Sequence, residues 1–152
     1  VVALRGPDGR ITHFLRTAVD LRETKAQAER IRQLAFFDPL TRLPNRALVT
    51  DRLRQALVSA ERRRQPLAVL FIDLDRFKEV NDLYGHKAGD DVLVTLARRM
   101  SEHLRADDLI ARLGGDEFVA LVECPSREEL LVPLRRLEAA LTAPVNLEGF
   151  AG

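Results

Sequence analysis

The pattern of apolar and polar positions divides the chain into short strands and amphipathic helices. Residues 1–19 predict two short strands, because the run Gly-Pro-Asp-Gly separates two apolar stretches. Asp20 is expected to cap a helix that ends near Phe36, with Glu23 as its partner in a capping box. The apolar stripe of that helix is thin, and two interpretations stay open: an amphipathic linker packed on its neighbours, or a short parallel coiled coil joining two protomers.

Two prolines interrupt the chain after this helix, and Asp38 just before them is expected only to cap a helical turn. A second helix with one apolar face is then predicted to reach about Arg64. The continuous apolar run at 67–72 predicts a strand that is buried on both faces or lies at the centre of a sheet.

Polar runs with glycine and proline divide the rest of the chain into three helices and a hairpin. Helices are predicted at 76–83, 90–104 and 127–141, hairpin strands at 109–113 and 118–123, and the start of a further hairpin at 145–150. This order of elements indicates an α+β fold with a ferredoxin-like βαββαβ core, in which an antiparallel-rich sheet carries helices on one face.

Composition narrows the class of protein. Apolar residues make up 46% of the 152 residues, which indicates a globular chain with a sizeable core. A formal net charge of +1 gives no strong field, so no nucleic-acid partner is expected. The single cysteine, Cys124, excludes an internal disulfide and fits a reducing compartment. No apolar stretch approaches the roughly 18 residues that a membrane span needs.

The strongest chemical signal is the run Gly-Gly-Asp-Glu-Phe at 114–118, which the pattern places at the tip of the predicted hairpin. Gly114 and Gly115 permit positive φ angles and a close approach of the backbone to a bulky ligand. Asp73 ends the earlier apolar strand, and in a βαββ unit that strand end lies beside the hairpin tip. Asp73 and Asp116 are therefore expected to lie together, which is costly unless a cation neutralises them.

A hard cation with oxygen ligands suits this pair of carboxylates, and the backbone carbonyl of Leu74 can join them. Mg²⁺ and Mn²⁺ both fit such a site. Three groups at the start of the following helix are expected to contact phosphates: the Lys78 side chain and the backbone amides of Arg76 and Phe77.

Asn81 and Asp90 carry an amide and a carboxylate that could hydrogen-bond the edge of a guanine. Simpler interpretations stay open for the same residues. Asp73 could cap a turn, Lys78 could belong to a solvated helix face, and Asn81 could be an ordinary polar residue at a helix end. Spacing alone therefore leaves both a Mg²⁺–nucleotide site and ordinary surface chemistry open.

Several spaced motifs together resemble one family, the GGDEF domains, which are diguanylate cyclases that make cyclic di-GMP from two GTP. The motifs are Asp-x-Leu-Thr-x-Leu-Pro-Asn-Arg at 38–46, Phe-Ile-Asp-Leu-Asp-Arg-Phe-Lys at 71–78, Asn-Asp at 81–82, Tyr-Gly-His at 84–86, Gly-Asp at 89–90 and Arg-Leu-Gly-Gly-Asp-Glu-Phe at 112–118. Their order is that of the family, over 38 to about 145. Residues 1–35 resemble the last strands of a PAS sensor domain and its signalling helix.

The resemblance implies a fold like the nucleotide-cyclase palm, with an antiparallel-rich sheet flanked by helices. It implies metal ligation by Asp73, the Leu74 carbonyl and Asp116. Glu117 would assist deprotonation of the attacking 3′-hydroxyl or hold a second metal ion. It also implies that Asn81 and Asp90 contact guanine, and that Lys78 and the amides of Arg76 and Phe77 contact the phosphates. Gly114 and Gly115 would leave room for the nucleotide.

Because one domain of this family holds one GTP, the resemblance implies a homodimer in which each 3′-oxygen attacks the α-phosphate of the partner's GTP. Arg105 and Asp108 match the family's Arg-x-x-Asp inhibitory site, with five residues between Asp108 and Gly114. They imply product feedback, in which a guanidinium forks to the product and a carboxylate accepts from its guanine.

The chain departs from the family in two places. Arg42 stands where glycine is commoner, and little effect is expected from it. The sequence stops at Gly152, before the family's Ser-x-Gly strand and the final helix whose Lys and Arg grip the triphosphate. We therefore expect a C-terminally truncated domain that binds or turns over GTP poorly by itself.

The expected organisation is the tail of a PAS-like domain at 1–19, a signalling linker helix at 20–36 and an incomplete GGDEF domain at 37–152. A cytoplasmic location is expected, with the natural N-terminus upstream, a possible inner-membrane anchor there, and a possible EAL phosphodiesterase domain downstream. Two alternatives to an active cyclase stay open. One is a catalytically silent GTP-binding module that regulates a phosphodiesterase, and the other is a cyclic di-GMP receptor working through Arg105 and Asp108.

Overall fold

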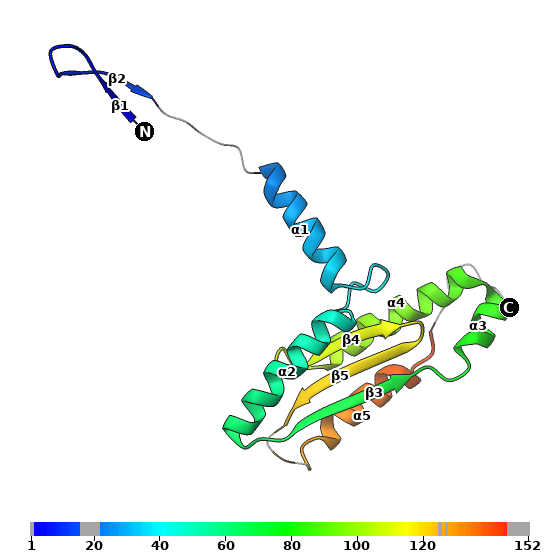
Figure 1. Cartoon of the computed structure of the whole chain (residues 1–152). Coiled ribbons are helices and arrows are strands. Elements are labelled where there is room, and N and C mark those ends of the chain that lie inside the picture. The colour runs from blue at the N-terminus through cyan, green and yellow to red at the C-terminus, as the bar shows by residue number, and fades with distance from the viewer. Residues whose placement is uncertain (1, 16–21, 125, 127, 146–152) are drawn as a thin grey trace. The chain divides into compact units, whose positions relative to one another are not determined.

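The computed structural model describes residues 2–15, 22–124, 126 and 128–145, which form two compact units (Figure 1). The first unit, Val1–Arg32, contains the antiparallel hairpin of β1 (Val2–Arg5) and β2 (Ile11–Leu15). Gly9 turns this hairpin with a φ of 76°, which confirms the predicted turn. The cap expected at Asp20 lies outside the described residues.

Helix α1 (Arg22–Phe36) follows, and none of its residues is buried. The amphipathic linker packed on its neighbours stays a prediction. The coiled coil between two protomers stays a prediction. No described helix of the chain is both long enough and apolar enough to cross a membrane.

The second unit, Gln33–Gly152, is built on a three-stranded antiparallel sheet in the order β3-β5-β4. Its strands are β3 (Leu67–Asp73), β4 (Leu109–Gly114) and β5 (Glu117–Glu123). Its helices are α2 (Arg46–Arg63), α3 (Phe77–Tyr84), α4 (His86–His103) and α5 (Leu131–Thr142). The order of elements confirms the α+β interpretation, and β4 and β5 form the predicted hairpin.

Helices cover both faces of this sheet, so the prediction of helices on one face was wrong. On one face, α4 and α5 pack Leu96, Met100 and Leu137 against Phe118 and Val122 of β5. On the other face, α2 packs its buried residue Val49 against a separate cluster, formed by Ala111, Val119 and Leu121. In Figure 1, α2 lies on the near side of the sheet and α5 on the far side. The apolar stripe of α2 is narrow, which is why the sequence did not reveal that it closes a second face.

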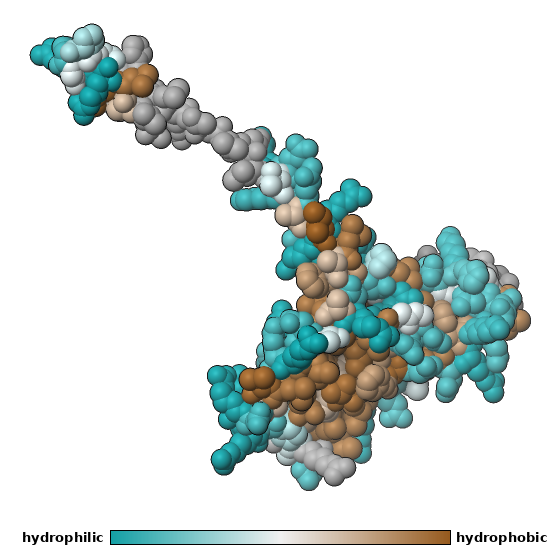
Figure 2. Space-filling model, in the orientation of Figure 1, coloured by the Kyte–Doolittle hydropathy of each residue, from teal (hydrophilic) through white to brown (hydrophobic). Residues whose placement is uncertain are grey.

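Among the described strands, β3 lies at an edge of the sheet, contrary to the predicted central or fully buried position. Its residues alternate in exposure, and Phe71 is 78% exposed. Helix α2 covers β4 and β5, which leaves Val69 and Phe71 of β3 open on the same face. Figure 2 shows the resulting apolar surface beside α2. A continuous apolar run identified a strand correctly but did not determine how its two faces are covered.

The helix boundaries follow local caps. Asn45 caps α2 by accepting from the backbone N–H groups of Ala47 and Leu48, at 2.9 and 3.1 Å. Helix α4 starts at His86, immediately after Gly85, and so begins one turn earlier than predicted. Helix α5 starts at Leu131 rather than at the predicted position 127, and the hairpin expected at 145–150 lies almost entirely outside the described residues.

Arg99 of α4 ties the end of α5 to the core. Its guanidinium donates to the carbonyl oxygens of Ala143 at 2.6 Å and Pro144 at 2.7 Å, and more weakly to that of Ala140 at 3.5 Å. The last carbonyls of a helix lack partners inside the helix, so a cation from a neighbouring helix is well suited to satisfy them.

Candidate functional site

The tip of the β4–β5 hairpin lies beside the end of β3. In the antiparallel register Asp73 is opposite Glu117, and Gly114 pairs with Glu117 on the other side. Directly opposite residues of antiparallel strands have Cα atoms about 4.5–5.5 Å apart. Asp116 occupies the turn next to Glu117. The structure therefore places three acidic residues, Asp73, Asp116 and Glu117, at the same end of the sheet, although more than forty residues separate Asp73 from the other two.

The two glycines of the turn are needed for their backbone conformation. Gly114 has a φ of 143° and Gly115 a φ of 55°, both in the region that disfavours side chains. A Cβ atom on either residue would meet no atom within 4 Å, so the turn also opens onto free space. Both features agree with the expectation that backbone here can approach a ligand.

A cleft of about 320 Å³ opens at this point. It is lined by Arg46, Phe71, Ile72, Asp73, Leu113, Glu117 and Phe118. Arg46 of α2 lies 3.8 Å from the carboxylate of Glu117, and both side chains are more than half exposed, at 66% and 56%. An ion pair this exposed contributes little to stability. It places one positive charge at the mouth of the cleft, and no signal in the sequence predicted it.

The donor set at the hairpin tip fits a hard divalent cation. Among the described residues no group of three or more His, Cys, Asp or Glu side chains forms a complete metal cluster. The predicted set instead combines the carboxylates of Asp73 and Asp116 with the Leu74 carbonyl, and Mg²⁺ typically takes one or two carboxylates and completes its shell with water and phosphate. The Leu74 carbonyl accepts from the Phe77 amide at 3.2 Å, which leaves it a second lone pair.

That same hydrogen bond bears on the expected phosphate contacts. The Phe77 amide already donates to Leu74, so a phosphate would have to compete for it. Arg76 precedes α3 in the left-handed conformation, with a φ of 59°, and its side chain lies 3.9 Å from Glu79. Lys78 is exposed on the first turn of α3. Lys78 and the amides of Arg76 and Phe77 thus lie at the start of α3, and their contacts with phosphate stay a prediction.

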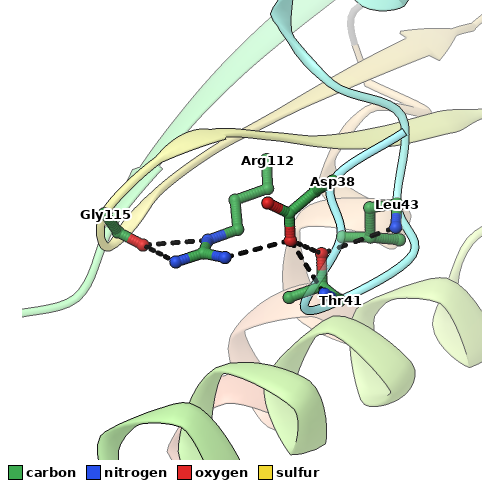
Figure 3. A network of polar contacts seen from close by, with 5 residues as sticks. All are labelled: Asp38, Thr41, Leu43, Arg112 and Gly115. Atoms are coloured by element: carbon green, nitrogen blue, oxygen red, sulfur yellow. Dashed lines mark hydrogen bonds and ion pairs between the residues drawn. The ribbon is translucent and has the colours of Figure 1, made fainter. Parts of the chain in front are cut away.

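A forked hydrogen bond from Arg112 holds the hairpin turn (Figure 3). Its Nε and Nη2 atoms donate to the carbonyl oxygen of Gly115 at 2.9 and 2.7 Å. That carbonyl belongs to the peptide group leading into Asp116, so the fork fixes the backbone from which this carboxylate projects. The third donor, Nη1, reaches the Oδ1 atom of Asp38 at 2.9 Å, and the Arg112 backbone N–H donates to the Pro44 carbonyl at 3.0 Å.

Asp38 was expected only to cap a helical turn. In the structure it also accepts the hydrogen bond from Arg112 and so anchors this network. Its Oδ1 atom also accepts from the backbone N–H and the hydroxyl of Thr41, at 2.8 and 2.7 Å, and that hydroxyl in turn accepts from Leu43. Burial opposes ionisation of Asp38, but the hydrogen bonds from Thr41 and Arg112 outweigh it and lower its pKa. The contact joins residues 74 positions apart, and no local pattern in the sequence signals it.

Helices α3 and α4 bring Asn81 close to the start of α4. A Cβ atom on Gly89 would overlap the Oδ1 atom of Asn81 and would lie 3.0 Å from its Cγ atom. The carboxamide of Asn81 therefore lies directly over Gly89, the residue before Asp90. The two groups expected to read guanine come from neighbouring positions on a helix pair.

Arg105 and Asp108 form a closed turn. The Asp108 Oδ2 atom accepts from the Arg105 backbone N–H at 3.0 Å, and the Asp108 N–H donates to the Arg105 carbonyl at 3.1 Å. A groove of about 500 Å³ runs past this turn, between α2 and the sheet. The exposed guanidinium of Arg105 and the second oxygen of Asp108 are the groups that the predicted inhibitory site would use.

Comparison with known proteins decides which family carries this arrangement. The family described as "Diguanylate cyclase, GGDEF domain" matches residues 35–150. The chain belongs to the GGDEF family. It is 52% identical over 114 residues to the diguanylate cyclase TpbB of Pseudomonas aeruginosa, covering 74% of this chain and 26% of that protein. It is 47% identical over 133 residues to the bifunctional diguanylate cyclase/cyclic di-GMP phosphodiesterase MucR of the same organism, covering 87% of this chain and 19% of that protein.

Solved structures of GGDEF domains share the fold. The GGDEF domain of TpbB superimposes with a TM-score of 0.71 at 50% identity, over 74% of this chain and 66% of that chain. The coiled coil and GGDEF domain of DgcB from Caulobacter crescentus, in complex with c-di-GMP, gives a TM-score of 0.70 at 27% identity, over 77% of this chain and 61% of that chain. The GGDEF chain described here spans about a fifth to a quarter of the curated relatives that it matches.

Proposed function

We propose that this GGDEF chain is the catalytic domain of a diguanylate cyclase, which condenses two GTP into cyclic di-GMP and two pyrophosphates. The observation that carries the proposal is the register that sets Asp73 opposite Glu117, with Asp116 in the adjoining turn. Asp73 and Glu117 line an open cleft, and Asp116 precedes Glu117 in the turn; such a set of acids suits phosphoryl chemistry far better than it suits folding, because like charges at close range repel.

Asp73, Asp116 and the Leu74 carbonyl would hold Mg²⁺ or Mn²⁺. When bound, such a cation neutralises phosphate charge and makes the 3′-hydroxyl easier to deprotonate. Glu117 lies at the cleft and would accept the proton of that hydroxyl. The 3′-oxygen then forms a bond to the α-phosphorus of the partner's GTP, the bond from that phosphorus to the bridging oxygen breaks, and pyrophosphate leaves.

Substrate binding would use the start of α3 and the α3–α4 pair. Lys78 and the amides of Arg76 and Phe77 would contact the phosphates, while Asn81 and Asp90 would hydrogen-bond the guanine edge. Since one cleft would hold one GTP, two protomers must face each other, and a homodimer is part of the proposal. Positioning two bound substrates in this way supplies much of the rate enhancement.

Product feedback is the second part of the proposal, and the closed Arg105–Asp108 turn beside the 500 Å³ groove favours it. The local hydrogen bonds hold Asp108 in place, so that the Arg105 guanidinium and one carboxylate oxygen stay available to a guanine nucleotide. Two of the similar solved structures are GGDEF domains with bound c-di-GMP, which supports binding of this product by members of the family. A silent GTP-binding module acting on a phosphodiesterase domain is the alternative that the test below separates.

The test is product analysis by chromatography after the full-length protein is incubated with GTP and Mg²⁺. The matched variants are Asp116→Ala and Asp51→Ala, because Asp51 is an exposed acid on α2, away from the hairpin. Cyclic di-GMP from the wild type and from Asp51→Ala, but not from Asp116→Ala, is the expected result. Bound GTP without product from the wild type would reject the cyclase and favour the regulatory module.

A further inference from the structure

The contact between α3 and α4 has one feature that helix stability does not explain. Gly89 is buried in the second half-turn of an 18-residue helix, where glycine is a poor helix former compared with alanine. Its φ is not among the positive values of the described chain, so its backbone conformation would accept alanine. What distinguishes glycine from alanine at this position is therefore the space around its Cα atom.

That space is filled by one side chain. A Cβ atom on Gly89 would overlap the Oδ1 atom of Asn81, and the next contact would be with the ring of Phe77 at 3.2 Å. The carboxamide of Asn81 thus packs against the backbone of α4 at Gly89. By comparison, Gly114 and Gly115 have no atom within 4 Å of a Cβ position. Of the three glycines Gly89, Gly114 and Gly115, Gly89 is the one whose missing side chain makes room for a polar group.

We propose that Gly89 is a positioning residue for nucleotide selection: it forms the seat that holds the Asn81 carboxamide at the guanine-reading position beside Asp90. The proposal rests on the function proposed above, in which Asn81 and Asp90 contact guanine. Asp90 follows Gly89 directly, so any shift of Asn81 away from Gly89 changes the spacing between the amide and the carboxylate. Two hydrogen-bonding groups recognise one base edge only when their spacing matches it.

Loss of the contact between Gly89 and Asn81 is expected to affect nucleotide binding more than folding. The atom that a Gly89 Cβ would displace is at the end of a rotatable side chain, so Asn81 can swing away without moving the backbone. Alanine at 89 also favours the helix. Gly89→Ala is therefore expected to fold normally while it loses the Asn81 contact. A residue that only filled the core would show the opposite pattern, with lower stability and unchanged nucleotide selection.

The experiment is a double-mutant cycle in the full-length protein, with Asn81→Ala, Gly89→Ala and the double variant. Calorimetry measures the Kd of 3′-deoxy-GTP and of 3′-deoxy-ITP, which lack the attacking hydroxyl; the inosine compound also lacks the 2-amino group. We expect Gly89→Ala and Asn81→Ala each to raise the Kd of 3′-deoxy-GTP about tenfold, which corresponds to the loss of one hydrogen bond. Each variant should also bring the Kd values of 3′-deoxy-GTP and 3′-deoxy-ITP closer together. The double variant should match Asn81→Ala within about twofold, because both changes remove the same contact.

Asp91→Ala is the matched control, since it raises helix propensity two positions away at an exposed site. It should keep the wild-type Kd values. An unaltered 3′-deoxy-GTP affinity in Asn81→Ala would reject the guanine role itself. A normal Asn81 effect with wild-type binding in Gly89→Ala would overturn only the seat. If Gly89→Ala lost its fold and the double variant did not regain it, Asn81 would not be the obstacle, and the seat would again be overturned.

Discussion

Removal of the Arg112 guanidinium, in an Arg112→Met variant, takes away its three side-chain hydrogen bonds, two to the Gly115 carbonyl of the hairpin turn and one to Asp38. The methionine keeps much of the apolar stem, so the change isolates the polar head. In the folded protein the Arg112 and Asp38 side chains are only 10% and 16% exposed. The variant therefore leaves a largely buried carboxylate without its cation and leaves the Gly115 carbonyl without its fork.

The magnitude follows from this burial. Breaking a buried ion pair by removing one partner costs about 3–5 kcal/mol. Asp38 keeps its two hydrogen bonds from Thr41, which compensate part of the loss, so we expect a destabilisation of about 3 kcal/mol. For a unit of this size, that lowers the melting temperature by about 10 °C. Arg112→Lys should recover less than half of the loss, because an ammonium group cannot fork to Gly115 and reach Asp38 together.

The assay is urea unfolding followed by circular dichroism, at pH 7 and at pH 3. Because the pKa of Asp38 is lowered in the folded state, its carboxylate stabilises the protein above its unfolded pKa and stops doing so as the pH falls through the folded value. The difference in the free energy of unfolding between wild type and Asp38→Asn should be largest at pH 7 and should shrink below about pH 4. A loss under 1 kcal/mol in Arg112→Met, or a gap that widens in acid, would refute the reasoning.

Three further outcomes test separate parts of the fold. Arg42→Gly and Arg64→Gly should each stabilise by about 0.5–1 kcal/mol in chemical denaturation, because both residues have left-handed backbone, with φ of 62° and 53°. Arg99→Ala should destabilise by about 1–2 kcal/mol, since it uncaps α5; Arg98→Ala, which removes only an exposed pair, should change stability by less than about 0.5 kcal/mol. Burial raises the pKa of the Cys124 thiol, so native protein should react with iodoacetamide at pH 8 far more slowly than unfolded protein; equal rates would contradict this.

Local sequence signals predicted the fold where one short stretch determines the outcome. The two glycines of 114–118 located a turn, and the apolar run at 67–72 located a strand. Neither signal reports what covers the strand. Val69 and Phe71 are exposed because α2 lies over β4 and β5, and this is decided by packing between distant elements. The early start of α4 at His86 was missed because Gly85 was taken as the end of one helix and not also as the start of the next.

The candidate site shows the same division. The topology of a βαββ unit predicts that the end of β3 lies beside the hairpin tip, and the register that pairs Asp73 with Glu117 confirms it; the contact between Asp73 and Asp116 stays a prediction. The roles of Arg112 and Gly89 were not predicted, because each depends on one contact between side chains or backbone on different elements. The spacing of apolar residues does not predict that the Arg112 guanidinium reaches Asp38 in a distant loop. It also does not predict that Gly89 leaves room for the side-chain amide of Asn81 from the preceding helix.

The Arg112 network also continues toward α1 through one residue. Asn45 caps the start of α2 with its Oδ1 atom, while its Nδ2 atom donates to the Ala35 carbonyl at 2.9 Å and its backbone N–H to the Phe36 carbonyl at 2.9 Å. The same residue therefore satisfies the end of one helix and the start of the next. Pro44, just before it, accepts from the Arg112 N–H. Because every link is a short hydrogen bond between neighbouring groups, the last turn of α1, the loop and the peptide before Asp116 form one continuous polar scaffold.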